Sequence, residues 1–266
     1  MTAVLFLKLG GSLITDKTGV EAVRTDVLHR VAQEISQARQ VIPDLQLLLG
    51  HGSGSFGHVA ATKYGTRHGV HNASQWHGFA KVSAAALRLN RLVVEALLAA
   101  GVPAISLSPS ASVQCVDGRI TEIAAKPIQN ALAAGLVPVV YGDVAFDTVR
   151  GGTIISTEEI MMALVGALRP SWLLLSGETA GVLDTGDQLI PQISTQNYAA
   201  IEPALGGSRG ADVTGGMATK VQNMLSLVQT HPELTIRIFS GLAAGVIART
   251  LAQPAAAGGT VITSFQ

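Results

Sequence analysis

The sequence predicts an α/β protein, in which parallel strands of an open sheet are covered by helices. Short apolar runs alternate with longer segments of helical periodicity along the whole chain. Hydrophobic residues make up 48% of the 266 residues and aromatic residues only 4%, which favours strands rich in Val, Leu and Ala that are buried on both faces. The length permits one large domain or two lobes.

Apolar runs bounded by turn residues locate the expected elements. The expected strands are residues 3–7, 45–49, 104–107, 137–141, 172–175, 236–239 and 260–262. Three helices are expected at about 25–40, capped by Thr25 or Asp26, at 79–100 and at 124–134. Four more are expected: one that begins at about 59, one that begins at about 156, one that ends at about 229, and one between the last two strands. Glycine-containing turns at 116–119 and 151–152 predict two hairpins. In the segment 79–100, Val82, Ala86 and Leu89 recur at helical spacing, so they indicate a core-facing stripe that could also wall an apolar pocket.

Charge and cysteine content argue against several classes of protein. The formal net charge is zero, so we expect neither nucleic acid nor an anionic membrane surface as a partner. Cys115 is the only cysteine, which excludes a disulfide framework and a cysteine metal cluster, and we predict no side-chain metal site. No apolar run is long enough to span a bilayer, and the N-terminal residues indicate a strand rather than a signal peptide. We therefore expect a cytoplasmic protein.

The stretch from Gly50 to His58 is the strongest indication of function. It places four glycines, Gly50, Gly52, Gly54 and Gly57, between a predicted strand and a predicted helix. Such a loop turns free backbone N–H groups toward one point, where the helix dipole also favours an anion. The spacing fits a dinucleotide-binding G-x-G-x-x-G, but no acidic residue lies between Asp44 and Glu95 to hold a ribose. The sequence therefore favours a phosphate site over a nicotinamide dinucleotide site.

Two further segments suggest anion binding. Lys8 ends the first strand directly before Gly10 and Gly11, so an ammonium and glycine amides would face the same group; the alternative is a charged strand end followed by a turn. Near the other end of the chain, Gly215 and Gly216 open a helix with Lys220 one turn further along. Asp143 follows a buried strand, and it would either orient Lys8 or Lys17 by ion pairing or be a solvated turn residue.

In combination, these motifs resemble the amino-acid-kinase superfamily. They are Lys8-Leu-Gly-Gly-Ser12, the loop 50–58, Tyr141-Gly-Asp-Val144 and Asp212-Val-Thr-Gly-Gly-Met217 followed by Lys220. The Gly-Ser-Phe-Gly-His sequence ending at His58, with Lys17 after the first motif, is similar to the isopentenyl phosphate kinase family. The resemblance implies a three-layer α/β/α sandwich with a mainly parallel open sheet. It also implies a single domain, with a substrate lobe at about 1–168 and a nucleotide lobe at about 169–266.

The resemblance further implies ATP-dependent phosphorylation of isopentenyl phosphate to isopentenyl diphosphate, with magnesium bridging the ATP phosphates, in a homodimer. ATP would be bound by Lys8, Leu9, Gly10, Gly11, Ser12, Ser53, Glu178, Gly215 and Lys220. The substrate would be bound by Gly52, Gly57, His58 and Thr157, and its apolar tail by Val82 and Ala86. The catalytic groups would be His58, Lys8, Lys17, Lys220 and Asp143, the last organising the lysines. Phosphoryl transfer fits this set, because it needs positioning and charge neutralisation more than a strong base.

The chain departs from the superfamily pattern near the nucleotide. Many members have Thr-Asp-x-Asp-Gly-Val where this chain has Gly177-Glu-Thr-Ala-Gly-Val182, so Glu178 lacks a second acid. Two rival functions remain. One is a fosfomycin-type phosphonate kinase, which has a similar Gly-Phe-Gly-His element. The other is a nucleotide-binding sensor or storage protein that retains the fold without turnover.

Overall fold

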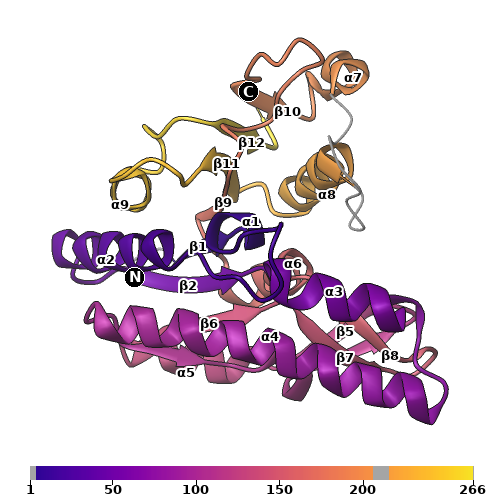
Figure 1. Cartoon of the computed structure of the whole chain (residues 1–266). Helices are drawn as coiled ribbons and strands as arrows, with labels where there is room; N and C mark the ends of the chain where they lie inside the picture. Colours follow the sequence, from indigo (N-terminus) through magenta and orange to yellow (C-terminus); the bar gives the residue numbers. More distant parts are fainter. Residues whose placement is uncertain (1–3, 206–215, 266) are drawn as a thin grey trace.

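The structure is a computed structural model that describes residues 4–205 and 216–265, without the side chains of residues 58–60 and 204. Its main sheet has eight strands in the order β10-β12-β11-β9-β1-β2-β6-β3 (Figure 1). These strands are β1 (Val4–Leu9), β2 (Gln46–His51), β3 (Ala104–Ser106), β6 (Val137–Tyr141), β9 (Trp172–Gly177), β10 (Gln192–Ser194), β11 (Thr235–Ser240) and β12 (Thr260–Thr263). All neighbours are parallel except β11 and β12, so the sheet is open and mainly parallel.

A second sheet of four strands lies beside α4, in the order β5-β4-β7-β8 (Figure 1). It consists of β4 (Val113–Val116), β5 (Arg119–Ile123), β7 (Asp143–Asp147) and β8 (Gly151–Ile155). Its antiparallel pairs, β4–β5 and β7–β8, are the two hairpins predicted from the turn residues.

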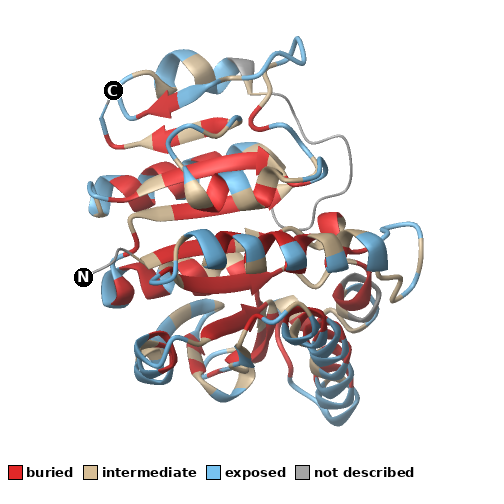
Figure 2. Cartoon of the chain, turned by 90° about the vertical axis from the view of Figure 1, so that its left-hand side faces the viewer, coloured by how far each residue is buried: buried red, intermediate tan, exposed pale blue. Residues whose placement is uncertain are grey.

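Helices cover both faces of the main sheet, because alternate strand residues point to opposite sides. The α-helices are α1 (Gly11–Ile14), α2 (Thr25–Val41), α3 (Gly54–Tyr64), α4 (Ala73–Ala99), α5 (Ala125–Ala133), α6 (Thr157–Leu168), α7 (Tyr198–Ile201), α8 (Gly216–Thr230) and α9 (Val246–Ala252). Short 3₁₀ turns are η1 (Thr66–His68), η2 (Pro109–Ala111) and η3 (Glu202–Ala204). Leu5 and Leu7 pack with α2, α4 and α9, whereas Phe6 packs with α5, α6 and α8. The central strands β1, β2, β6, β9 and β11 are accordingly mostly buried (Figure 2).

Most predicted elements are present, with three corrections at their ends. The helix expected from about 59 begins at Gly54, so the second half of the glycine loop is already helical. The helix expected at 79–100 begins at Ala73, where the Asn72 side chain caps it by accepting a hydrogen bond from the Gln75 N–H. Neither Thr25 nor Asp26 caps α2, whose N-cap is Arg24. Within the described part of the chain, no helix has the length and apolarity needed to cross a membrane.

Candidate active site

Two glycine loops meet at the ends of the neighbouring parallel strands β1 and β2. The first contains Gly10 and Gly11, and the second is the segment 50–58. Leu9 and His51 are paired in register at these ends, and the Gly52 N–H donates to the Leu9 carbonyl at 3.0 Å. A Cβ at Gly11 would lie 2.5 Å from the backbone nitrogen of Gly54, and a Cβ at Gly52 would lie 2.9 Å from that of Gly11. Since both neighbours are backbone atoms that cannot move aside, this close approach requires glycine.

Thr15 connects the two loops through its side chain. Its hydroxyl donates to the Gly11 carbonyl at 2.7 Å and accepts from the Ser55 N–H at 3.0 Å. Gly54, which lies next to this hydroxyl, has a φ of +48°, in the left-handed region where L-residues are strained. Thr15 could not be predicted as a site residue, because a threonine after a short apolar run carries no distinctive pattern.

A carboxylate joins two of the predicted catalytic lysines. The Nζ atoms of Lys8 and Lys220 lie 2.6 and 2.9 Å from the same oxygen, Oε1 of Glu158. Burial opposes ionisation of Glu158, but the two ammonium groups outweigh it and hold the pKa of this carboxyl at about 2. Glu158 is therefore ionised at neutral pH, and it holds lysines from β1 and α8 at one point.

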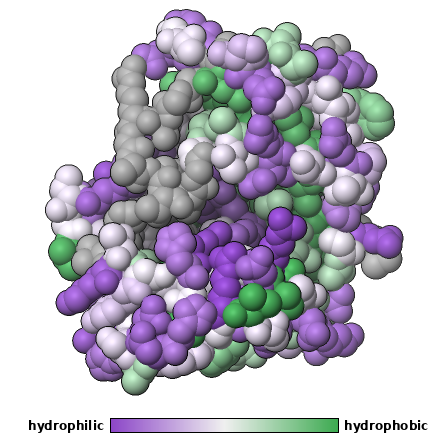
Figure 3. Space-filling model, turned by 90° about the vertical axis from the view of Figure 1, so that its right-hand side faces the viewer, coloured by the Kyte–Doolittle hydropathy of each residue, from purple (hydrophilic) through white to green (hydrophobic). Residues whose placement is uncertain are grey.

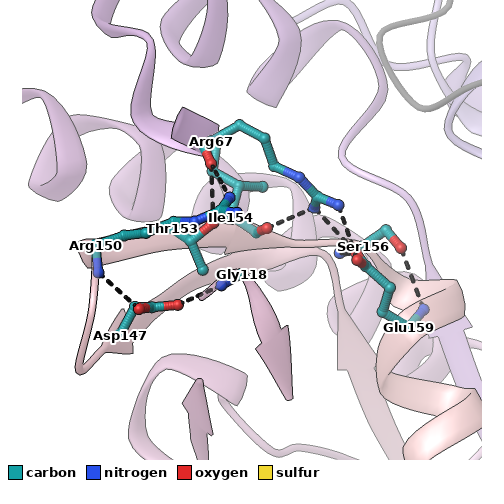
Figure 4. Close-up of polar contacts among 8 residues, drawn as sticks. All are labelled: Arg67, Gly118, Asp147, Arg150, Thr153, Ile154, Ser156 and Glu159. Atoms are coloured by element: carbon teal, nitrogen blue, oxygen red, sulfur yellow. Dashed lines mark hydrogen bonds and ion pairs between the residues drawn. The ribbon is translucent and has the colours of Figure 1, made fainter. Parts of the chain in front are cut away.

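The start of α6 places Glu158. Ser156 and Glu159 form a capping box, in which the Ser156 hydroxyl accepts from the Glu159 N–H and Glu159 accepts from the Ser156 N–H (Figure 4). The Arg67 guanidinium donates to both carboxylate oxygens of Glu159, at 2.8 and 3.1 Å, and to the Ile154 carbonyl at 2.5 Å. Arg67 follows α3, so it ties the end of the helix that starts at the glycine loop to the start of the helix that carries Glu158.

Asp143 does not have the role expected from the sequence. Its carboxylate accepts hydrogen bonds from the N–H groups of Val144, at 2.8 Å, and Ser110, at 3.4 Å, and only 1% of the residue is exposed. Burial raises the pKa of this carboxyl. The prediction that Asp143 organises Lys8 is wrong: Glu158 pairs with that lysine, and Asp143 is neither solvated nor a surface turn residue.

The edge that carries α3, α8 and the hairpin β7–β8 is shown in Figure 3, the view from the right-hand side of Figure 1. Hydrophilic residues gather in the middle of this face, and a patch of apolar residues adjoins them. A binding site for a phosphorylated hydrocarbon would need both kinds of surface, charged groups for the phosphate and an apolar region beside them.

A protein-family model matches most of the chain. The model described as "Amino acid kinase family" matches residues 3–240. The chain belongs to the amino acid kinase family.

Relatives of this kinase include two archaeal proteins named isopentenyl phosphate kinase. The protein of Methanocaldococcus jannaschii is 34% identical over 81% of this chain and 84% of its own length. That of Methanothermobacter thermautotrophicus is also 34% identical, over 88% of this chain and 90% of its own length. A solved structure titled "X-ray structures of isopentenyl phosphate kinase" covers 98% of this chain and 100% of its own, with a TM-score of 0.82 and 30% identity. These findings confirm the resemblance and the three-layer fold.

Other predicted nucleotide-site residues of the kinase lie around the first glycine loop. Gly10 caps α1, and its N–H donates to the Ser176 carbonyl at 2.7 Å; Leu9 is buried and Ser12 lies within α1. Glu178 forms an ion pair with Arg24 at 2.9 Å. Lys17 lies exposed in the loop after Thr15. Gly215 is outside the described residues.

The predicted substrate residues lie in the second glycine loop, at the start of α6 and on α4. The Thr157 hydroxyl is buried and donates to the His51 carbonyl at 2.6 Å, so it supports the loop from below. Gly57 lies in the first turn of α3, against the side chain of Ser53, the N-cap residue that was predicted to face ATP. The backbone of His58 belongs to α3, but its side chain is outside the described residues.

Val82 lies in a small apolar cluster with Val70, Phe79 and Val144, and Ala86 is buried one turn further along α4. This cluster joins α4 to the second sheet.

Glu158 was not among the site residues predicted from the sequence. The segment 156–159 was identified only as a helix start, and two adjacent glutamates there satisfy the usual preference for acidic residues at a helix N-terminus. The available signal was position: Glu158 lies in the first turn of α6, which directly follows β8.

Proposed function

We propose that this kinase transfers the γ-phosphoryl group of ATP to isopentenyl phosphate, forming isopentenyl diphosphate and ADP. The observation that carries the proposal is the Lys8–Glu158–Lys220 cluster in a chain whose glycine loops touch backbone to backbone. The curated relatives with this name cover most of the chain, which supports the same substrate.

The reaction needs little covalent chemistry from the protein. An oxygen of the acceptor phosphate forms a bond to the γ-phosphorus while the bond to the β–γ bridging oxygen breaks, and ADP leaves with that electron pair. The acceptor phosphate is already ionised at neutral pH, so no strong base is required. The role left to the protein is to align two anions that repel each other and to neutralise their charge.

Lys8 and Lys220 supply this neutralisation in our proposal. Glu158 holds both ammonium groups together before the substrates arrive, which reduces the reorganisation required during the transfer. We further assign Lys17 and His58 to the transferred and acceptor phosphates, respectively. Gly10, Gly11, Ser12, Ser53, Gly215 and Glu178 are assigned to the nucleotide side, and Gly52, Gly57 and Thr157 to the acceptor side.

The apolar tail of the substrate is assigned to α4. Val82 and Phe79 pack there with Val144 from β7 in a buried apolar cluster beside the second sheet. Burial of a five-carbon chain against this cluster would contribute binding energy that inorganic phosphate lacks.

Magnesium would enter with ATP. The described residues contain no group of three His, Cys, Asp or Glu side chains suited to a metal ion. The residues present fit a metal ion held mainly by phosphate oxygens and water, which is the usual environment of Mg²⁺ in kinases, and it would supply further neutralisation of the phosphates.

We also propose that the chain is one domain with lobes at about 1–168 and 169–266, and that it forms a cytoplasmic homodimer. The single domain is supported by the continuity of the main sheet, since β1 of the first lobe pairs with β9 of the second. The dimer rests on the family resemblance alone, and light scattering on the purified protein would test it.

The test is ATP consumption with isopentenyl phosphate and, separately, with fosfomycin. Turnover of isopentenyl phosphate that collapses in His58→Ala is the expected result. Turnover of fosfomycin alone would instead assign the kinase to phosphonate modification. ATP binding without turnover of either acceptor would favour a nucleotide sensor.

A further inference from the structure

His51, directly before Gly52, has no part in the proposed transfer, yet three residues distant in the sequence hold it in place. None of the residue is exposed. Its carbonyl accepts hydrogen bonds from the Thr157 hydroxyl and from the Gly142 N–H, the latter at 3.3 Å. Its imidazole stacks on the Tyr141 ring, with the centroids 5.6 Å apart and 9° between the planes. A titratable side chain is thus held rigidly beneath the second glycine loop.

Both ring nitrogens of His51 face oxygen atoms. Nε2 lies 3.1 Å from Oδ1 of Asn90, and Nδ1 lies 3.2 Å from the carbonyl oxygen of Gly52. A neutral imidazole has one N–H, so one nitrogen would direct a lone pair at an oxygen. A doubly protonated ring would satisfy both, but burial lowers the pKa of His51, despite the opposing effect of these two contacts. The ring is therefore neutral, and one partner must change its role.

Rotation of the Asn90 amide by 180° resolves the conflict, because its oxygen and nitrogen have nearly the same size and exchange places. The amide nitrogen then donates to Nε2 of His51. The amide oxygen takes the place of Nδ2, 2.6 Å from the Ser106 hydroxyl, and accepts its proton. Nδ1–H of His51 is then free to donate to the Gly52 carbonyl, so both ring nitrogens of His51 and the Asn90 oxygen have a hydrogen-bonding partner.

The hydrogen bond to Gly52 orients the next peptide group. The described chain has no cis peptide bond, so the N–H of Ser53 points opposite to the carbonyl of Gly52. If that carbonyl is held toward the buried ring, the Ser53 N–H faces away from the core. Among the described residues, no group accepts a hydrogen bond from this N–H.

We propose that His51, as the neutral Nδ1–H tautomer, is a positioning residue that turns the Ser53 N–H toward a bound phosphate. The identity of that phosphate rests on the proposed function, whereas the tautomer and the peptide orientation do not. Asn90, which lies on α4, selects the tautomer of His51. The helix assigned to the substrate tail therefore also sets the geometry of the second glycine loop.

A matched pair of variants tests the role. In His51→Asn the amide nitrogen replaces Nδ1, and in His51→Gln it replaces Nε2; both lose the ring stacking on Tyr141. We expect His51→Asn to keep KM for ATP and for isopentenyl phosphate within about threefold of the wild type. We expect His51→Gln to raise one of the two KM values by about tenfold or more, the effect of losing one hydrogen bond to a charged group, with a smaller change in kcat. Equal losses in both variants, or a larger loss in His51→Asn, would overturn the proposal.

The tautomer can be read directly in the full-length protein without any ligand. With ¹⁵N-labelled histidine, long-range ¹H–¹⁵N correlations of the imidazole distinguish the two neutral tautomers from the imidazolium. A neutral ring protonated at Nδ1 is expected, and protonation at Nε2 or at both nitrogens would overturn the proposal. If the wild type turned over no isopentenyl phosphate, the proposed function would fail. In that case, titration of wild type and both variants with ATP would test the His51 inference through Kd, with the same expected order.

Discussion

Two carboxylates, the partly buried Glu158 and the buried Asp143, lie in opposite electrostatic surroundings. Glu158 has two ammonium groups within 2.9 Å, and its pKa stays at about 2 although burial opposes ionisation. Asp143 accepts hydrogen bonds from backbone N–H groups, and burial raises its pKa. The sequence pattern predicts that Asp143 contacts the lysines, but in the structure Glu158 contacts Lys8 and Lys220.

The difference shows that a buried acid near a phosphate site is not sufficient to organise lysines. Direct contact with two cations turns burial into an advantage, because the attraction grows stronger where water is excluded. Without such contact, burial only penalises the charge. Four experiments test this contrast, beginning with the largest expected effect.

Replacement of the carboxylate between the lysines should have the largest effect on activity. Glu158→Gln keeps the shape but removes the charge that holds Lys8 and Lys220 together. We expect kcat for ATP-dependent transfer to fall by about 100-fold, as for loss of a preorganised charge in other enzymes. Steady-state kinetics at saturating ATP would measure it. A decrease of less than about fivefold would show that the lysines do not need Glu158.

The two carboxylates should affect the pH dependence of stability with opposite signs. The folded-state pKa of Glu158 is depressed from 4.5 to about 2, so its contribution is present above pH 4.5 and is lost as the pH falls toward 2. This contribution is on the order of 3 kcal/mol. The folded-state pKa of Asp143 is raised from 3.8, so its penalty is absent below that pH and grows as the pH rises through the raised value.

Denaturant unfolding of wild type, Glu158→Gln and Asp143→Asn across this pH range would measure both effects. The advantage of wild type over Glu158→Gln should shrink as the pH falls. The advantage of Asp143→Asn over wild type should grow as the pH rises. Parallel curves for all three proteins would contradict the contrast.

Loss of the contacts between Arg67 and Glu159, the residue next to Glu158, should have an intermediate effect on activity. These contacts are called the clamp below. Arg67→Ala removes both hydrogen bonds to Glu159 and the one to the Ile154 carbonyl. Since 42% of the Arg67 side chain is exposed, we expect a loss of only about 1 kcal/mol in unfolding free energy. The matched control is Arg91→Ala, whose partner Glu95 lies on the same helix; 79% of that arginine side chain is exposed. It should change stability by less than about 0.5 kcal/mol.

Kinetics of these two variants would show whether the clamp positions Glu158. A kcat lowered by about tenfold in Arg67→Ala, with no change in Arg91→Ala, is expected. Unchanged kcat in both would limit Arg67 to a structural role.

Replacement of Asp143 should have the smallest effect. Asp143→Asn removes a charge that burial penalises and keeps an oxygen for the Val144 N–H. We expect kcat to remain within about threefold of the wild type and the unfolding free energy at pH 7 to change by less than about 1 kcal/mol. A loss of activity comparable to that of Glu158→Gln would restore Asp143 to the catalytic role predicted from its sequence position.

The sequence by itself determined the succession of most strands and helices along the chain. It also determined both glycine loops and the positions of the lysines near them in the sequence. These features are local: Gly10 and Gly11 follow an apolar run directly, and the segment 50–58 needs no distant partner to be identified as a turn. The three-residue strand β10 was missed, because so short a run carries no period and forms only by pairing with β12.

The tertiary structure alone decided which groups meet. Lys8 and Glu158 are 150 residues apart, and the chain contains 18 acidic residues, so sequence pattern could not select the partner of that lysine. The link between Thr15 and Ser55 and the contact between His51 and Asn90 are likewise made across the fold. Local physics determines where the backbone turns, whereas long-range packing determines which charges and hydrogen-bonding groups face one another after it has turned.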